Sequence, residues 1–255
     1  MVAVGIDCGA KTVKVVLMKD GQIIGKSLVM AGIDTKVSVK EAFDEALQKA
    51  GLTRNDVDNI VATGAGKKEA IFTKDIITEV AAAAKGAIYL NPAVRTVVDV
   101  GAEEGRAIKV DESSKVVDFA INEKCAAGAG AFTEAMARAL EVKIEEMGPL
   151  SMKSTQVVPM NAQCAVFAES ELVTLVHSKV PKPDMARAIH DAIADRIISM
   201  VRRVGIEKEI MLIGGVAHNI GFVDSMSRGL AMEVVIPEAP EFVGALGAAL
   251  AAGGK

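Results

Sequence analysis

Tryptophan is absent from the 255-residue sequence, and tyrosine occurs once. Aromatic residues make up only 3% of the chain, so few side chains are available for bases to stack on. The formal net charge is −4, from 29 Lys and Arg against 33 Asp and Glu. A chain without excess positive charge has no general attraction for nucleic acid or anionic lipid, and we expect neither as a partner.

Long apolar runs are missing too. No uncharged apolar stretch reaches the roughly 20 residues that a membrane span requires. The N-terminal MVAVGIDCGAK enters an alternating strand pattern at once, without the basic leader and apolar core of a secretion signal. The three cysteines therefore do not describe a disulfide framework and are free thiols or metal ligands. We expect a cytoplasmic protein.

What the sequence does contain is a large share of core-forming residues. Hydrophobic residues make up 51% and charged residues 24% of the chain. This composition excludes disorder, and the length suits one large domain or two lobes of roughly 100 to 150 residues.

The first 70 residues alternate between strand and helix patterns. Two alternating apolar segments flank a turn at residues 9–11, and Asp20-Gly21 marks a hairpin. A charged amphipathic helix is predicted over about residues 36–50, ending at Gly51. The stretch NIVATGAGKKE then predicts a buried strand running into a glycine loop.

The sequence also repeats itself. VGIDCGAKTVKVVLMKDGQII matches VVDVGAEEGRAIKVDESSKVV at an offset of 92 residues, which aligns the Asp-x-Gly turn at Asp7 with that at Asp99. Both copies read strand, turn, strand, polar hairpin, strand. Two such units predict two similar lobes, each presenting an acidic glycine turn to a shared cleft.

The C-terminal half predicts further helices and strands. MARAIHDAIADRIISMVRRVG has apolar residues at spacings of three and four and Gly205 placed to end a core-facing helix. EIMLI predicts a strand that breaks at Gly214-Gly215 before another helix. VVIPEAPEFVGALGAALAA predicts a final strand and a small-residue helix that packs closely.

The two Asp-x-Gly turns suit a nucleotide. Glycine turns bring backbone N–H groups close to phosphate oxygens, and the carboxylates of Asp7 and Asp99 would hold a hydrated Mg²⁺. Glu103 and Glu104 follow the second turn; we assign Glu104 to Mg²⁺ or to orienting the attacking water, with surface acids as the alternative. A Walker loop at TGAGKKE is excluded because Val61 and Lys68 stand where that motif needs Gly and Ser or Thr.

These motifs resemble those of the superfamily of actin, sugar kinases and heat-shock chaperone ATPases. IDCGAKTVKVVL is similar to its first phosphate motif, VVDVGAEEGRAI to its second and IMLIGGVAHN to its adenosine motif. The resemblance implies an α/β, two-lobed actin-like ATPase with duplicated ribonuclease H-like lobes, one of residues 1–95 plus about 238–255 and one of residues 96–237. The implied nucleotide-binding residues are Gly9, Ala10, Lys11, Thr12, Lys14, Gly101, Ala102, Gly214, Gly215 and Val216.

Two cysteines stand in similar settings. Cys125 precedes a Gly128-Ala129-Gly130 turn and a helix-prone run, and Cys164 also opens a helix-like segment. At a helix N-terminus the partial positive charge lowers a thiolate pKa and favours an anionic metal cluster. Two thiolates do not complete a site that needs four, whereas two subunits would supply four, which suits one 4Fe-4S cluster. We expect Cys8 to have a packing role.

CAAGAGAF and CAVFAES resemble the paired cysteine motifs of the BadF/BadG/BcrA/BcrD ATPase family, which includes 2-hydroxyacyl-CoA dehydratase activators and benzoyl-CoA reductase ATPase subunits. The resemblance implies that Cys125 and Cys164 bind a 4Fe-4S cluster shared with a second subunit. It also implies that ATP hydrolysis drives a low-potential electron to a CoA-ester reductase or dehydratase. Ferredoxin or flavodoxin is the implied electron source.

One departure from the family pattern bears on the assembly. Dehydratase activators usually carry a Gly-Gly-Gln-Asp run where this chain reads Gly101-Ala102-Glu103-Glu104, so it looks more like the benzoyl-CoA reductase type and its partner would be a second copy or a paralogous subunit. Two alternatives stay open. One is a kinase of the same fold that phosphorylates a sugar or amino sugar, and the other is a nucleotide-switched assembly protein.

Overall fold

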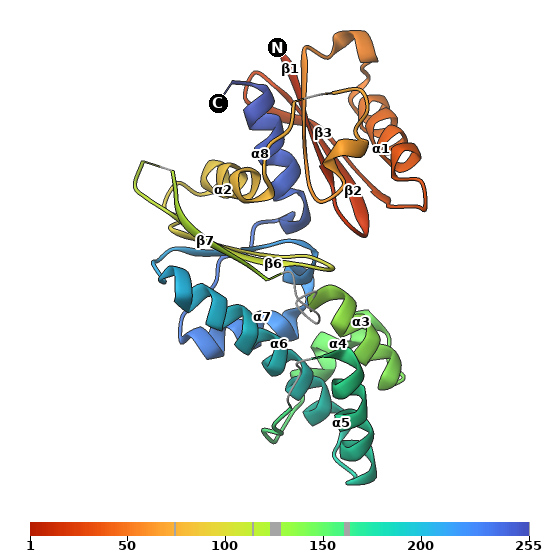
Figure 1. Cartoon of the computed structure of the whole chain (residues 1–255), viewed down its shortest axis with the longest axis vertical. Helices are drawn as coiled ribbons and strands as arrows, with labels where there is room; N and C mark the ends of the chain where they lie inside the picture. The colour runs from red at the N-terminus through yellow and green to blue at the C-terminus, as the bar shows by residue number, and fades with distance from the viewer. Residues whose placement is uncertain (74, 114, 123–128, 161–163, 255) are drawn as a thin grey trace. The chain divides into compact units, whose positions relative to one another are not determined.

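The computed structural model describes residues 1–73, 75–113, 115–122, 129–160 and 164–254. The chain divides into two compact units. Unit 1 comprises Met1–Val97, Val110–Val117 and Pro237–Lys255, and unit 2 comprises Val98–Lys109 and Asp118–Ile236. The chain carries two four-stranded sheets, each accompanied by helices, which makes the fold α/β as predicted (Figure 1).

The first sheet has the strand order β3-β2-β1-β4. Its members are β1 (Val2–Cys8), β2 (Thr12–Lys19), β3 (Gln22–Met30) and β4 (Asn59–Thr63). The first three form an antiparallel meander, while β4 runs parallel to β1. The hairpin between β2 and β3 turns at Asp20 and Gly21, whose φ angles of 52° and 84° are those of the tight turn that the Asp-Gly pair predicts.

Helices cover the two faces of the first sheet. Helix α1 (Thr35–Ala50) packs on the face that carries Val4, Ile6 and Ile60, and α8 (Val243–Ala252) packs on the face that carries Ala3 and Val61. Helix α2 (Glu79–Leu90) packs against α8. Short 3₁₀ turns lie at Arg54–Asp56, Lys67–Glu69 and Pro240–Phe242.

The predicted helix over residues 36–50 is confirmed by the way α1 is capped. The Asp34 carboxylate accepts a hydrogen bond from the Lys36 backbone N–H, and Gly51 ends the helix with a left-handed φ of 67°. Glycine adopts that conformation at no steric cost because it has no Cβ.

The second sheet has the order β7-β6-β5-β8, which is the order of the first sheet with equivalent strands in equivalent places. Its members are β5 (Thr96–Val100), β6 (Gly105–Val110), β7 (Val116–Asn122) and β8 (Ile210–Ile213). The internal repeat that the sequence predicts is therefore a repeat of topology.

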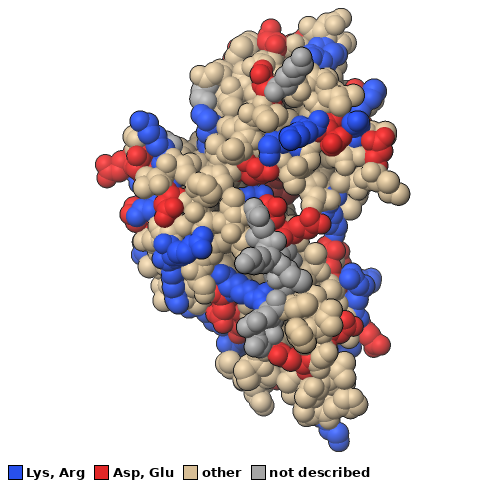
Figure 2. Space-filling view, viewed as in Figure 1, with Lys and Arg blue, Asp and Glu red and all other residues tan. Residues whose placement is uncertain are grey.

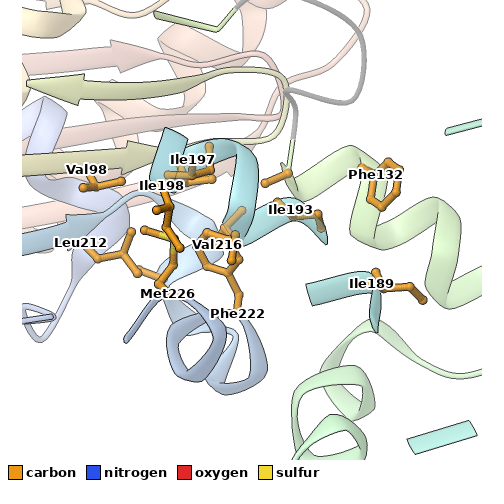
Figure 3. Packing of buried hydrophobic residues seen from close by; sticks show 14 of the residues in the cluster. Val98, Phe132, Ile189, Ile193, Ile197, Ile198, Leu212, Val216, Phe222 and Met226 are labelled. Carbon is orange, nitrogen blue, oxygen red and sulfur yellow. The ribbon is translucent and has the colours of Figure 1, made fainter. Parts of the chain in front are cut away.

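Unit 2 buries its core beneath a bundle of helices. These are α3 (Ala129–Ala139), α4 (Ile144–Ser151), α5 (Ala165–His177), α6 (Lys182–Val204) and α7 (Ile220–Leu230), with a 3₁₀ turn at Gly215–His218. The apolar stripe of α6 meets side chains of the sheet and of α7 (Figure 3). Gly205 follows the last residue of α6, so the predicted helix and its end are confirmed.

Two local predictions are wrong. The segment at Val234–Ile236 forms one isolated parallel bridge, between Val235 and Met211, and no strand; Pro237 follows it and has no N–H to extend the ladder. Ala129 and Gly130 belong to the first turn of α3 and not to a turn that precedes the helix. Gly128 lies outside the described residues.

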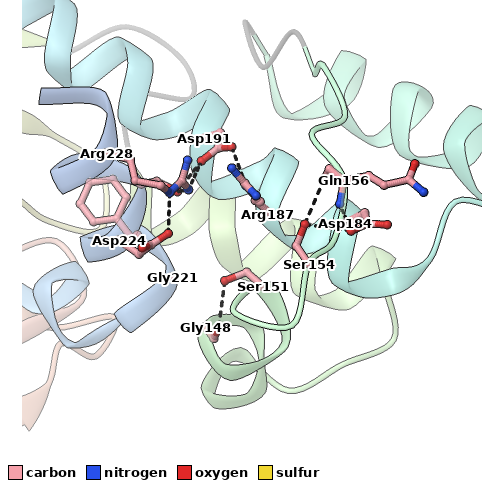
Figure 4. A network of polar contacts seen from close by, with 12 residues as sticks. Gly148, Ser151, Ser154, Gln156, Asp184, Arg187, Asp191, Gly221, Asp224 and Arg228 are labelled. Atoms are coloured by element: carbon pink, nitrogen blue, oxygen red, sulfur yellow. Dashed lines mark hydrogen bonds and ion pairs between the residues drawn. The ribbon is translucent and has the colours of Figure 1, made fainter. Parts of the chain in front are cut away.

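A polar network ties the helices of unit 2 together (Figure 4). The Asp191 carboxylate of α6 accepts hydrogen bonds from Arg228 and Ser225 of α7, both at 2.6 Å. Near the start of α6, the buried Asp184 carboxylate accepts three hydrogen bonds from Ser154, Thr155 and Gln156. Hydrogen bonds lower the pKa of Asp184, and the largest contribution comes from the Ser154 hydroxyl. This carboxylate is therefore ionised at neutral pH.

Within the part of the chain that the structure describes, no helix is both long enough and apolar enough to cross a membrane. On the face shown in Figure 2, basic and acidic side chains are interspersed among uncharged surface, in line with the small net charge.

Candidate nucleotide and metal site

The first group of candidate site residues, in unit 1, lies at the end of β1. Asp7 pairs with Lys14 of the antiparallel neighbour β2, and the Lys14 Nζ donates to Asp7 Oδ2 at 3.0 Å. Both side chains are more than four-fifths buried. The turn between the two strands is closed by a hydrogen bond from the Gly9 backbone N–H to the Thr12 carbonyl at 3.1 Å. Asp7, Gly9, Thr12 and Lys14 are thus brought together, whereas Ala10 and Lys11 are exposed at the tip.

Two glycines that sequence reasoning did not select lie against the Asp7 carboxylate. Gly64 follows β4 with a φ of 92°, and a Cβ there would be 2.5 Å from Asp7 Oδ1. Gly244, in the first turn of α8, would bring a Cβ to 3.5 Å from Asp7 Oδ2. The carboxylate thus sits among backbone from three separate segments, with close approach that only glycine permits at residue 64.

A second group of candidate site residues, in unit 2, repeats this arrangement. Arg106 stands at the position equivalent to Lys14 and donates from Nη1 to Asp99 Oδ2 at 3.0 Å. It also pairs with the Glu104 carboxylate. Glu104 is therefore held by a cation beside Asp99, while Glu103 is exposed. The offset of the repeat aligns Lys14 with Arg106, so this signal was present in the sequence, although it did not lead to selection of Arg106.

Gly214 in unit 2 occupies the position equivalent to that of Gly64 in unit 1. It follows β8 with a φ of 88°, and a Cβ there would be 2.3 Å from the Val100 carbonyl and 2.8 Å from Asp99 Oδ1. Gly215 is exposed next to it, and Val216 is buried in the core. Of the predicted adenosine residues, Gly215 therefore presents its backbone at the surface, whereas Gly214 is half-buried and Val216 is buried in the core.

The second Asp-x-Gly turn is bonded directly to helix α3. The backbone N–H of Gly130 donates to the Gly101 carbonyl at 3.2 Å, and that of Ala131 donates to the Ala102 carbonyl at 2.9 Å. A Cβ on Gly130 would lie 2.9 Å from the Ala102 Cα, so glycine is required for this approach. Gly130 is thus explained by contact with the phosphate-motif turn.

The two cysteines that the structure describes lie in different environments. Cys8 is fully buried on the α1 face of the first sheet, and burial, with a smaller contribution from the Asp7 charge, raises its pKa to about 12. A thiol in that state is neutral and packs as a small apolar group. Cys164 is half-buried at the N-cap of α5, with extended backbone (φ −145°, ψ 144°). Cys125 lies outside the described residues, four positions before the start of α3.

The three histidines differ in burial. His177 and His218 are exposed, at the end of α5 and beyond Gly215 respectively. His190 is fully buried in α6, where its Nε2 lies 3.0 Å from the Asn219 Nδ2. Burial lowers the pKa of His190 to about 4, so its ring is neutral at physiological pH.

The donors present suit two kinds of metal group. No set of three or more His, Cys, Asp or Glu side chains that could hold a metal ion occurs among the described residues. Asp7 and Asp99 are carboxylates beside glycine backbone, which fits a Mg²⁺ that keeps most of its water and binds through nucleotide phosphates. Cys164 at a helix N-terminus, with Ala165, Val166 and Phe167 and no acid in the first turn, fits the binding of an anionic cluster.

Comparison with known proteins adds to this geometry. The model of the BadF/BadG/BcrA/BcrD ATPase family matches residues 4–252. The (R)-2-hydroxyglutaryl-CoA dehydratase activating ATPase of Acidaminococcus fermentans is 38% identical over 249 residues, covering 96% of this chain and 95% of that protein. One of the subunits of the benzoyl-CoA reductase of Thauera aromatica is 33% identical over 261 residues, covering 98% of this chain and 92% of that protein.

Solved structures show the same relationship. The activator of the 2-hydroxyisocaproyl-CoA dehydratase from Clostridium difficile, with bound ADPNP, matches with a TM-score of 0.93 at 34% identity over 99% of this chain and 94% of that chain. A ROK family glucokinase from Streptomyces griseus matches with a TM-score of 0.60 at 12% identity over the full length of both chains, which shows the fold alone. The predicted actin-like ATPase fold is confirmed.

Proposed function

Because the chain belongs to the BadF/BadG/BcrA/BcrD ATPase family, we propose that it is an ATPase that drives one-electron transfer to a CoA-ester dehydratase or reductase. The relatives named above are an activating ATPase of a dehydratase and one of the subunits of benzoyl-CoA reductase, and both kinds match over almost the whole chain. The Gly-Ala-Glu-Glu sequence after Asp99 supports the reductase type, with a partner that is a second copy or a paralogous subunit.

The observation that carries this proposal is the bonding between the second Asp-x-Gly turn and helix α3. Gly101 and Ala102, which would bind phosphate, accept hydrogen bonds from the first turn of the helix that follows Cys125. Helix α3 in turn packs against α5, whose N-cap is Cys164. A movement of the turn on nucleotide binding or hydrolysis therefore acts on both helices that begin after the cysteines.

The residues around the two carboxylates have distinct roles in this proposal. Backbone N–H groups of the turns at Gly9 and Gly101 bind phosphate oxygens, and Asp7 and Asp99 hold the hydrated Mg²⁺. Lys14 and Arg106 fix the two carboxylates and compensate their charge before nucleotide arrives. Glu104, positioned by Arg106, orients the attacking water.

Cys125 and Cys164 would hold the electron-transfer group. Each chain contributes two thiolates, and two chains together complete the four that one 4Fe-4S cluster requires. Such a cluster supplies a single low-potential electron, which a ferredoxin or flavodoxin replaces. In this proposal ATP would bring together the two lobes predicted from the sequence, and the protein would work in the cytoplasm.

Anaerobic purification with iron counting tests this function. We expect about four irons per two chains, with an EPR signal on reduction. Cys125→Ser and Cys164→Ser should each remove the iron and abolish electron transfer, while ATP binding persists. Cys8→Ala is the matched control, because its thiol is buried in unit 1 whereas the proposed ligands belong to unit 2, and it should retain iron.

Two results would contradict the proposal. Iron-free wild-type protein that hydrolyses ATP in proportion to an added sugar would instead support the kinase alternative, for which the glucokinase match provides only the fold. A colourless, stable dimer with slow ATPase activity and no electron transfer would support an assembly protein.

A further inference from the structure

The hydroxyl of Thr63 is buried without a hydrogen-bond partner. Among the described residues, three buried side-chain polar atoms have none: Thr63 Oγ1, Asp184 Oδ2 and His190 Nδ1. Asp184 and His190 have partners at their other polar atom, whereas Thr63 has only the one. Burying an unpaired hydroxyl costs free energy, so a group of this kind in a native fold calls for an explanation.

Thr63 is the immediate neighbour of Asp7. It is the last residue of β4, and the parallel register pairs it with Asp7 of β1. Residues paired in adjacent strands project to the same face of a sheet, with strands about 4.8 Å apart. Val61, two residues earlier, packs on the α8 face, and a Cβ on Gly244 of α8 would lie 3.5 Å from Asp7 Oδ2. The hydroxyl and the carboxylate therefore lie side by side on that face.

The second sheet supplies an internal control for the packing requirement. Ile213 is the last residue of β8 and precedes Gly214, as Thr63 is the last residue of β4 and precedes Gly64. The Ile213 side chain is also fully buried. The fold accepts a hydrocarbon at this position, so the hydroxyl of Thr63 is not needed for folding.

We propose that the Thr63 hydroxyl hydrogen-bonds a water molecule of the hydrated Mg²⁺ that Asp7 holds when nucleotide is bound. Mg²⁺ in nucleotide sites keeps several waters, and a hydroxyl accepts a hydrogen bond from one of them and donates another. The inference rests on the ATP-binding part of the proposed function and is independent of the cluster. It makes Thr63 a positioning residue, since it acts through water.

The test measures ADP affinity by calorimetry with Mg²⁺ and with EDTA, together with the melting temperature of the nucleotide-free protein. Thr63→Val keeps the shape and removes the hydroxyl. We expect it to weaken Mg-ADP binding by about tenfold, as for the loss of one hydrogen bond near a charge, and to leave binding in EDTA unchanged. The melting temperature should stay equal or rise, and Thr63→Ser should restore Mg-ADP affinity.

A matched control is Thr73→Val in the same unit, whose hydroxyl donates to the Ile60 carbonyl at 2.6 Å. It should lower the melting temperature and leave Mg-ADP affinity unchanged. Unchanged Mg-ADP affinity in Thr63→Val would overturn the proposal, and so would a lower melting temperature, because the hydroxyl would then be satisfied within the protein. Wild-type protein that binds Mg-ADP but no iron would contradict the electron-transfer function, whereas this test of Thr63 would remain valid.

Discussion

Two candidate site carboxylates, Asp7 in unit 1 and Asp99 in unit 2, are each paired with a cation from the neighbouring strand. Lys14 serves Asp7 and Arg106 serves Asp99, and all four side chains are largely buried. The two pairs therefore hold both carboxylates in place and compensate their charge while the nucleotide is absent.

At the same scale, the buried His190 predicts a pH dependence of stability. Its ordinary pKa of 6.5 falls to about 4 in the fold, because burial disfavours the charged ring more than Asp191 and Asp224 favour it. The unfolded chain therefore binds an additional proton between these values, and stability should fall as the pH drops from about 6.5 to about 4, by up to about 3 kcal/mol. Above pH 6.5 and below pH 4 this contribution is constant. Urea denaturation across this range measures it.

The hydrogen bonds of Asn219 show that Nε2 of the neutral His190 ring is an acceptor, so this ring carries its proton on Nδ1. Asn219 Oδ1 accepts from the backbone N–H groups of Gly221 and Phe222, so its Nδ2 donates to His190 Nε2. Protonating His190 would set two donors against each other. His177→Asn, at an exposed site, is the control and should keep the wild-type slope. The same slope in His190→Gln would assign the titration to another group.

At the scale of elements, helix α8 packs against its neighbours backbone to backbone. A Cβ on Gly5 of β1 would lie 1.9 Å from the Ala245 carbonyl oxygen, and one on Gly247 would lie 1.8 Å from the Ala82 carbonyl oxygen of α2. Neither neighbour is the end of a flexible side chain. These contacts fix α8, and hence Gly244 beside Asp7, to the sheet and to α2.

Gly247→Ala should therefore destabilise the protein in spite of the better helix propensity of alanine. The propensity gain is about 1 kcal/mol, whereas forcing a methyl into backbone costs about 3 kcal/mol or more. A net loss near 2 kcal/mol would lower the melting temperature by about 4 to 8 °C for a chain of this size. Gly253→Ala, where the nearest atom would be an ordinary 3.5 Å away, is the control and should change little. Equal melting temperatures for the two variants would refute the packing argument.

Helices and turns were predicted correctly where their sequence signals are local. The Asp20-Gly21 hairpin, the α1 cap at Gly51 and the apolar stripe of α6 depend on neighbours within a few residues, and all three were predicted. Gly64 and Thr63 were missed because their roles depend on the parallel pairing of β4 with β1, more than 50 residues away in sequence. The mistaken strand near Val235 had strand-forming residues but only one bridge to extend.

At the scale of the whole molecule, the repeat at an offset of 92 residues predicted the duplicated topology. The same offset aligns Arg106 with Lys14, but Arg106 was missed because its pairing with Asp99 is seen only in the folded structure. The site roles of Cys125 and Cys164 stay predictions, and so do the lobe boundaries given from the sequence.

Unit 1 is assembled from segments that are far apart in the chain, which gives a prediction for truncation. Residues Pro237–Lys255 belong to unit 1 together with Met1–Val97, and their helix α8 covers one face of the first sheet. Removing residues 237–255 would expose Val16, Met18 and Val61 and should leave unit 1 unfolded. Limited proteolysis followed by mass spectrometry should then cut within residues 1–97 first. Removing only residues 254 and 255 is the control and should preserve wild-type resistance.

The same arrangement sets an order of events during synthesis. The ribosome makes the strands of the first sheet early, but α8, which covers one of their faces, emerges only after the entire second unit has been translated. For that interval the apolar face carrying Ala3, Val16 and Val61 has no cover. The nascent chain therefore passes through a stage in which unit 2 is ready to fold and unit 1 is not, and it is at this stage that a chaperone would have the most to protect.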